Sequence, residues 1–110
     1  MTCSKPTVHI PIGSNSVVTF DMTPRLESAE LLTGTPSVTD SEATGELTIV
    51  NQQVNTVADS ANDIEIGKAA QFQISTIATT CTEYTLTIIA TTDGTPSQTL
   101  ADELVVVFHD

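Results

Sequence analysis

Basic residues are scarce in this sequence. Lys5, Arg25 and Lys68 are its only cations beside fourteen acidic residues, which gives the 110-residue chain a formal net charge of -11. Nucleic-acid-binding proteins need a basic patch to release counterions from phosphates, and three scattered cations do not form one. An anionic membrane surface is a poor partner for the same reason. We therefore expect no nucleic acid and no membrane among the partners.

Aromatic residues and long apolar runs are also scarce. The chain has no Trp, and its aromatic side chains are Phe20, Phe72, Tyr84 and Phe108. The core must therefore consist mainly of Val, Ile, Leu and Ala. No segment approaches the roughly 18 to 20 apolar residues of a membrane-spanning helix. Met1–Pro6 lacks the apolar stretch of a secretory signal, so we expect none in this chain.

The few cysteines and histidines predict no metal centre. Cys3 and Cys81 lie far apart and match no metal-binding spacing. They could form a disulfide if the N-terminal arm crosses the Cys81 loop, but without a secretory signal two free thiols are favoured. His9 and His109 would meet if the first and last strands pair, yet two histidines alone do not make a metal site.

The densest group of oxygen-bearing side chains lies at Asp59, Asn62, Asp63 and Glu65. Its spacing is not that of an EF-hand, and Ca²⁺ requires six to eight oxygen ligands. A solvated acidic loop is the favoured interpretation. No nucleophile elbow and no glycine-rich nucleotide-binding motif is present. We therefore expect a protein that is not an enzyme and uses no cofactor.

What the sequence does contain is a series of β-strand patterns between Ala70 and Phe108. Apolar residues alternate with polar ones through Ala70–Ser75 and Glu83–Ala90, and Leu100–Phe108 completes the set. Alternation with a period of two places one row of side chains on each face of a strand. The residues that we expect in the core are Phe72, Ile74, Tyr84, Leu86, Ile88, Val106 and Phe108.

Further strands are expected at 7–12, 17–22 and 47–51, with a short one at 36–39. Pro6 and Pro11 cannot donate ladder hydrogen bonds, so the first strand should lie at a sheet edge. Residues 26–32 allow a short helix or a strand over 28–33, and we favour the strand. The count of seven or eight short strands predicts an all-β, Ig-like antiparallel β-sandwich. We expect one domain, 7–110, after a flexible arm, 1–6.

Two local features refine this prediction. Tyr84 begins the penultimate strand, where a tyrosine corner would bond its hydroxyl to the backbone a few residues upstream; an ordinary half-buried tyrosine is the alternative. Asp93-Gly94 is a hairpin signal, because glycine accepts the positive φ of many hairpin turns, although the turn type stays open.

Asp102 and Glu103 interrupt the final apolar strand. One of them should face water, while the other points toward the facing sheet or an edge. An inward charge on a terminal strand blocks edge-to-edge aggregation. Alternatively, the pair marks a place where a neighbouring subunit supplies a cation.

The runs IEIGKAAQFQIS and EYTLTIIATTDGTPSQTLADELVVVF resemble the C-terminal half of small tailed-phage virion proteins known as fiber-tail adaptors. The family pattern runs from a strand of the form xGxAVQFxVSGG to a strand and hairpin of the form GxxYxLTxxATTSDGQT. The matching residues are Gly67, Gln71, Phe72, Ile74, Tyr84, Leu86, Thr87, Ala90, Thr91, Thr92, Asp93, Gly94 and Thr99. Where the family has a Gly-rich turn, this chain has Ser75–Cys81.

The resemblance implies an Ig-like sandwich that joins tail or neck components to fibers in the virion, as a multi-copy symmetric assembly with other virion proteins. Such a module would bind through edge strands, loops and termini. We expect partner contacts at Lys5, Asp93, Gly94, Asp102 and Glu103.

Two alternatives stay open. One is a capsid decoration protein on the phage head. The other is an Ig-like adhesin module that binds a glycan, against which the scarcity of aromatic residues speaks.

Overall fold

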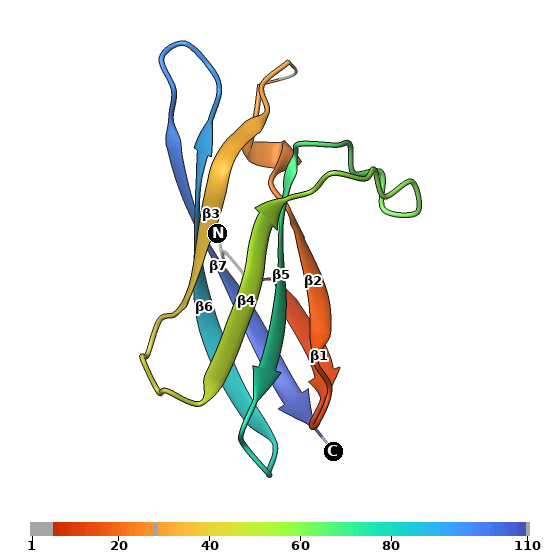
Figure 1. The fold of residues 1–110 in the computed structure, drawn as a ribbon, viewed down its shortest axis with the longest axis vertical. Coiled ribbons are helices and arrows are strands. Elements are labelled where there is room, and N and C mark those ends of the chain that lie inside the picture. Colours follow the sequence, from red (N-terminus) through yellow and green to blue (C-terminus); the bar gives the residue numbers. More distant parts are fainter. Residues whose placement is uncertain (1–5, 28, 110) are drawn as a thin grey trace, which may run out of the picture.

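A computed structural model describes residues 6–27 and 29–109, which form seven β-strands in two facing sheets (Figure 1). This confirms the all-β prediction. A short 3₁₀ helix, η1 (Thr23–Arg25), follows the second strand. The strands are β1 (Thr7–Pro11), β2 (Ser16–Asp21), β3 (Leu32–Asp40), β4 (Leu47–Val54), β5 (Ala69–Thr76), β6 (Thr82–Thr92) and β7 (Thr99–His109).

The strand order is that of an Ig-like sandwich with one displaced strand. One sheet has the order β1-β7-β6-β3 and the other β2-β5-β4. In an Ig constant-type domain the first strand joins the sheet of the second, fifth and fourth strands. Here β1 instead pairs with β7, and the two run parallel, with Thr7 opposite Val105 and Pro11 opposite His109. The expected sandwich is thus not wholly antiparallel, because the first and last strands, unlike neighbours in a hairpin, are free to pair in parallel. β1 lies at an edge, as its prolines predicted.

The alternating runs of β5, β6 and β7 supply the centre of the core. The seven residues expected there are at most 2% exposed. Tyr84 and Phe108 meet edge to face, with ring centroids 5.8 Å apart and an interplanar angle of 78°. Such a pair contributes about 0.5–1.5 kcal/mol beyond its buried area. Val18 and Phe20 of β2, the neighbour of β5 in its sheet, belong to the same cluster.

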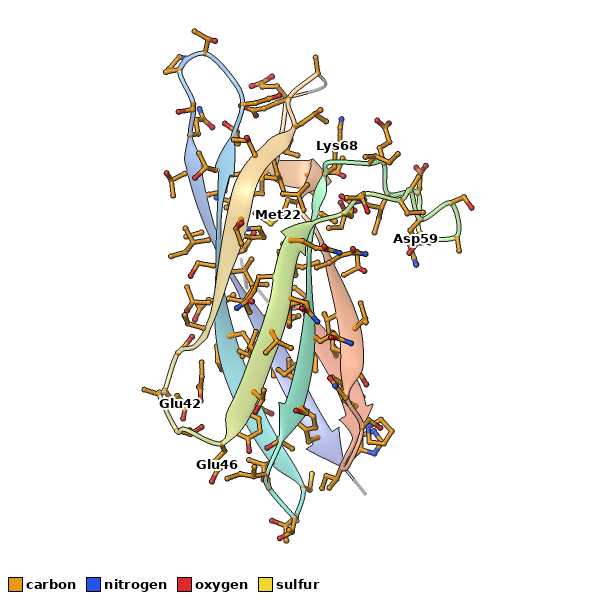
Figure 2. All side chains as sticks on the ribbon, in the orientation of Figure 1. Met22, Glu42, Glu46, Asp59 and Lys68 are labelled. Atoms are coloured by element: carbon orange, nitrogen blue, oxygen red, sulfur yellow. The ribbon has the colours of Figure 1, made fainter. Side chains whose placement is uncertain are left out.

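The Tyr84 hydroxyl does not form the backbone hydrogen bond expected of a tyrosine corner. It donates to Glu46 Oε1 at 2.7 Å and lies 2.9 Å from Thr76 Oγ1. Glu46 lies beside the start of β4, near the end of the sandwich where β5 turns into β6 (Figure 2). Burial of the phenol raises the pKa of Tyr84, because the charged form loses hydration. The side chains of Glu46 and Thr76 thus replace the backbone acceptor.

The strand expected over 28–33 is wrong at 29–31 and correct from Leu32, while residue 28 lies outside the described residues. After η1 the chain makes a further turn, with Glu30 N donating to Glu27 O at 3.0 Å, and β3 begins only at Leu32. The short strand expected at 36–39 is the second half of the same β3. A register shift between Thr33 and Ser37 separates the two halves, and it accommodates Pro36, which has no ladder donor.

A projecting loop connects β4 to β5, and one side chain holds it at its base. Asn55 is buried, and its Oδ1 accepts from the backbone N–H groups of Gly67, Lys68 and Ala69 at 2.9–3.0 Å. Its Nδ2 donates to Val57 O at 3.2 Å and to Glu65 O at 2.9 Å. Figure 2 shows Asp59 far out on this loop and Lys68 at its return into β5. The Asn55 side chain therefore holds the two ends of the loop together where the β4–β5 ladder ends.

Candidate partner-binding site

The loop between β6 and β7 carries Asp93 and Gly94, two of the residues expected to contact a partner. It folds against the segment that precedes β3. Asp93 N donates to Leu31 O at 2.9 Å, and Leu31 N donates to Asp93 Oδ1 at 2.9 Å. These bonds extend the β3–β6 ladder by one residue beyond the pair of Leu32 and Thr92. Part of the Asp93 carboxylate is therefore committed to positioning the loop.

Glycine suits position 94 for a reason other than the turn conformation expected for it. Its φ is not positive, whereas four other glycines of the described chain have positive φ. A Cβ at Gly94 would instead overlap Oε2 of Glu30. Glycine therefore allows the loop to approach the Glu30 carboxylate closely.

Between this loop and the segment before β3 lies a hollow of about 550 Å³. Its acidic lining consists of Glu27, Glu30 and Asp93, and Thr95, Pro96 and Gln98 close the loop side. Glu30 is only 9% exposed, and its Oε1 accepts from Glu27 N at 3.1 Å. Three carboxylates around one concave surface favour a positively charged side chain of a partner. Glu27 and Glu30 were not predicted from sequence, because their meeting with Asp93 depends on the pairing of β3 with β6.

Asp102 and Glu103 have different surroundings on β7. Asp102 lies on the strand face that also carries Leu100 and Leu104, and its Oδ2 is 2.9 Å from Arg25 Nη1. Arg25 also donates to Ala101 O at 3.3 Å. Within the described chain, the cation that faces Asp102 thus comes from η1. Glu103 is exposed on the opposite face.

Two other predicted features lie partly outside the described residues. Lys5 and Cys3 belong to the segment 1–5, which the structure does not describe. Cys81 is an exposed free cysteine at the turn between β5 and β6.

The histidines and the Asp59 loop do not form a metal-binding group. The rings of His9 and His109 do meet, with centroids 6.1 Å apart. In the loop, Asp59 Oδ1 accepts from Asn62 N at 3.3 Å and Oδ2 accepts from Asn62 Nδ2 at 2.8 Å, so this carboxylate caps a turn. Within 6–27 and 29–109, no three His, Cys, Asp or Glu side chains are grouped closely enough to hold a metal ion.

A second hollow, of about 490 Å³, lies on the outer face of the β2-β5-β4 sheet. Side-chain amides of Asn51, Gln53, Gln71 and Gln73 line it. Asn51 Nδ2 donates to Gln73 Oε1, and Gln71 Nε2 donates to Thr19 Oγ1 at 3.0 Å. Asn51 enters this row because β4 bulges between Val50 and Gln53, and its φ is 58°. The alternation of β5 predicts that Gln71 and Gln73 share its outer face, but no sequence signal predicts the bulge that brings Asn51 beside them.

Comparison with known proteins adds no relatives. No protein-family model, no curated protein and no solved structure matches this chain. In the described part of the chain, no helix is long and apolar enough to cross a bilayer.

Proposed function

We propose that this chain is a non-enzymatic structural protein of a tailed bacteriophage virion, an adaptor that joins tail or neck components to fibers. It is assembled in the host cytoplasm in several symmetric copies. The supporting observation is the position of the residues that match the fiber-tail adaptor pattern. They run from Gly67 to Thr99, through β5 and β6 to the start of β7, and these strands hold the centres of both sheets. The resemblance therefore concerns the framework of the sandwich and not one loop.

The acidic hollow is the contact site that best fits this role. Glu27, Glu30 and Asp93 line it, and the chain as a whole carries a charge of -11. A basic side chain of a neighbouring virion protein would enter the hollow and be attracted over several ångströms. The β6–β7 loop, held by the two hydrogen bonds between Asp93 and Leu31, presents the site in a fixed shape.

Quantitative mass spectrometry of purified particles tests the proposal. We expect the chain in the particle at a copy number that fits one or two symmetric rings. Its absence from the particle would overturn the proposal. A copy number that matches the capsomers of the head would instead identify the alternative, a capsid decoration protein.

Charge-neutral variants test the hollow itself. Glu27→Gln combined with Asp93→Asn removes two charges while keeping oxygen acceptors, so the fold should persist and incorporation into particles should fall. Glu42→Gln combined with Glu83→Gln also removes two charges, at exposed positions outside the lining of the hollow, and serves as the matched control. Equal incorporation of both variants would show that the hollow is not the contact.

The amide-lined hollow favours one other function, a glycan-binding module. Amides of Asn and Gln supply both donors and acceptors for sugar hydroxyls. A saturable signal on a glycan array that is lost in Gln73→Ala would support this alternative over the adaptor. The four aromatic residues do not help it, since Phe20, Phe72, Tyr84 and Phe108 are all buried.

A further inference from the structure

The four sheet edges of the described chain differ in how well they are protected against pairing with another strand. β1 has only five residues and ends in Pro11. β3 contains Pro36 and a register shift, and its Leu32 N already donates to Gly67 O at 2.8 Å. β4 bulges between Val50 and Gln53. Short strands, prolines and bulges are the usual means of blocking an edge. β2 has none of these: it pairs with β5 over six residues without a shift.

The hydrogen-bond pattern shows which groups of β2 face outward. Met22 N donates to Lys68 O at 2.9 Å. Bonded and non-bonded pairs alternate along an antiparallel ladder, so the pairs Phe20–Ala70 and Val18–Phe72 are also bonded. The main-chain groups of Val17, Thr19 and Asp21 consequently point away from β5. The hydrogen bond of Ala69, the residue opposite Asp21, supports this assignment. The Ala69 C=O accepts from Asn55 N on the β4 side of β5, so it points away from β2.

The geometry points to β2 as a docking edge for an extended segment of another protein. Added as a strand, this segment would bond to the N–H and C=O groups of Val17 and Thr19. The inference rests on the sheet geometry and on the charge of the chain, and it does not depend on a role in a virion.

The side chains of β2 indicate what such a segment carries. On one face Val18 and Phe20 point into the core, so an added strand would present apolar side chains on that face. On the other face Val17 is 62% exposed beside the amide-lined hollow. With a net charge of -11 this protein as a whole attracts basic side chains and repels a second copy of itself. The occupant is therefore a strand of a different protein, alternately apolar and basic.

Amide hydrogen exchange on the full chain, with a synthetic peptide as probe, tests this inference. In the free protein the N–H groups of Val17 and Thr19 should exchange fast, and those of Val18 and Phe20 slowly. Addition of the peptide Lys-Val-Lys-Val-Lys-Val should slow exchange at Val17 and Thr19. No added protection at the highest soluble peptide concentration would overturn the inference.

N-methylated peptides separate strand addition from mere charge attraction. One version carries N-methyl groups on its three valines and the other on its three lysines, so both keep the same charge. Only one set of N–H groups can face β2, so one version should bind at least about tenfold more weakly than the other. Equal binding of the two would overturn the inference. Protection that instead grows with protein concentration, without peptide, would identify a second copy as the occupant and overturn it as well.

The variant Thr19→Pro gives an independent test on the protein. The Thr19 N–H faces the open edge, so proline removes a donor to the peptide without removing a ladder bond to β5. Peptide protection of Val17 should be lost while the exchange pattern of β5 stays unchanged. Unaltered peptide binding by the folded variant would contradict the assignment, and if the variant fails to fold, the N-methylated peptides decide.

Discussion

At the scale of single residues, two buried polar side chains organise parts of the molecule that apolar packing alone would leave undetermined. Tyr84 brings together Glu46 and Thr76 from the strand ends at one end of the sandwich. Asn55 gathers three backbone donors and two carbonyl groups at the base of the β4–β5 loop. A buried polar group costs little when it is fully hydrogen-bonded and a great deal when a partner is lost. These sites are therefore sensitive to substitution.

The raised pKa of Tyr84 predicts a loss of stability in alkaline solution. The phenol stays protonated in the folded protein above the pH where it ionises in the unfolded chain, near pH 10. Its contribution is fully present below that pH and is lost as the pH rises through the folded pKa, so the free energy of unfolding should fall. Tyr84 is the only tyrosine, and phenolate absorbance therefore reports its titration directly. Ionisation at the pH of a free tyrosine would contradict this prediction.

Phe72→Ala tests the assignment of strand faces on β5. Phe72 is 1% exposed within the core, and its truncation should lower the free energy of unfolding by about 3–5 kcal/mol. Thr48→Ala, at an exposed position of the neighbouring strand β4, is the control and should change stability by less than about 1 kcal/mol. Urea denaturation of both variants measures the difference. Equal stability of the two would mean that the faces of β5 are assigned incorrectly.

Gly94→Ala tests the close approach of the β6–β7 loop to Glu30. The added methyl must displace the Glu30 carboxylate from Glu27 N, which should cost about 1 kcal/mol. In a Glu30→Ala background the same change should be neutral or stabilise by about 0.4–1 kcal/mol, because alanine restricts the unfolded chain. A double-mutant cycle measures this coupling. Identical effects in both backgrounds would show that Glu30 does not require glycine here.

At the scale of elements, the strands with regular alternation could be predicted from sequence, whereas the conformations of the connections could not. β5, β6 and β7 could be predicted because their side chains alternate between core and solvent. Residues 26–32 mislead, since Leu26 caps η1, Leu32 begins β3, and a turn between Glu27 and Glu30 separates the two. Likewise, the acidic hollow depends on contacts between residues about sixty positions apart, which local patterns do not encode.

Asn55→Ala should destabilise the β4–β5 loop selectively. The substitution removes the Oδ1 acceptor shared by the N–H groups of Gly67, Lys68 and Ala69. Gly67 N keeps Asn55 O and Lys68 N keeps Glu65 O, whereas Ala69 N is left unsatisfied, at a cost of about 1–3 kcal/mol. Hydrogen exchange should therefore accelerate most at Ala69. Asn62→Ala, which removes a hydrogen bond within the exposed turn, is the matched control. If the control accelerates exchange as much as Asn55→Ala does, the role of Asn55 at the base of the loop is wrong.

At the scale of the whole molecule, the dominant property is an excess of negative charge on a small sandwich. Three cations stand against fourteen acidic side chains, so carboxylates greatly outnumber the cations that could pair with them. Arg25 pairs with Asp102, but at 44% and 32% exposure this ion pair contributes only about 0–1 kcal/mol. Repulsion between like charges therefore outweighs pairing, and it favours binding to basic surfaces.

Salt should consequently stabilise the isolated protein. Raising the ionic strength to about 0.15 M shortens the screening length to about 8 Å and weakens the repulsion between exposed carboxylates. The melting temperature measured by circular dichroism at neutral pH should rise with salt. Near the isoelectric pH, where the net charge vanishes, the same titration should have a smaller effect. A melting temperature that falls with salt at neutral pH would show that ion pairs dominate instead.

The central claim is that this sandwich joins components of a virion tail or neck. Cryo-electron microscopy of purified particles, with this chain located in the density, tests the claim most directly. We predict a symmetric ring of sandwiches between the tail or neck and the fibers, with the hollow at Glu27, Glu30 and Asp93 facing a basic side chain of a neighbour. Density for this chain on the capsid surface, or none in the particle, would contradict the account.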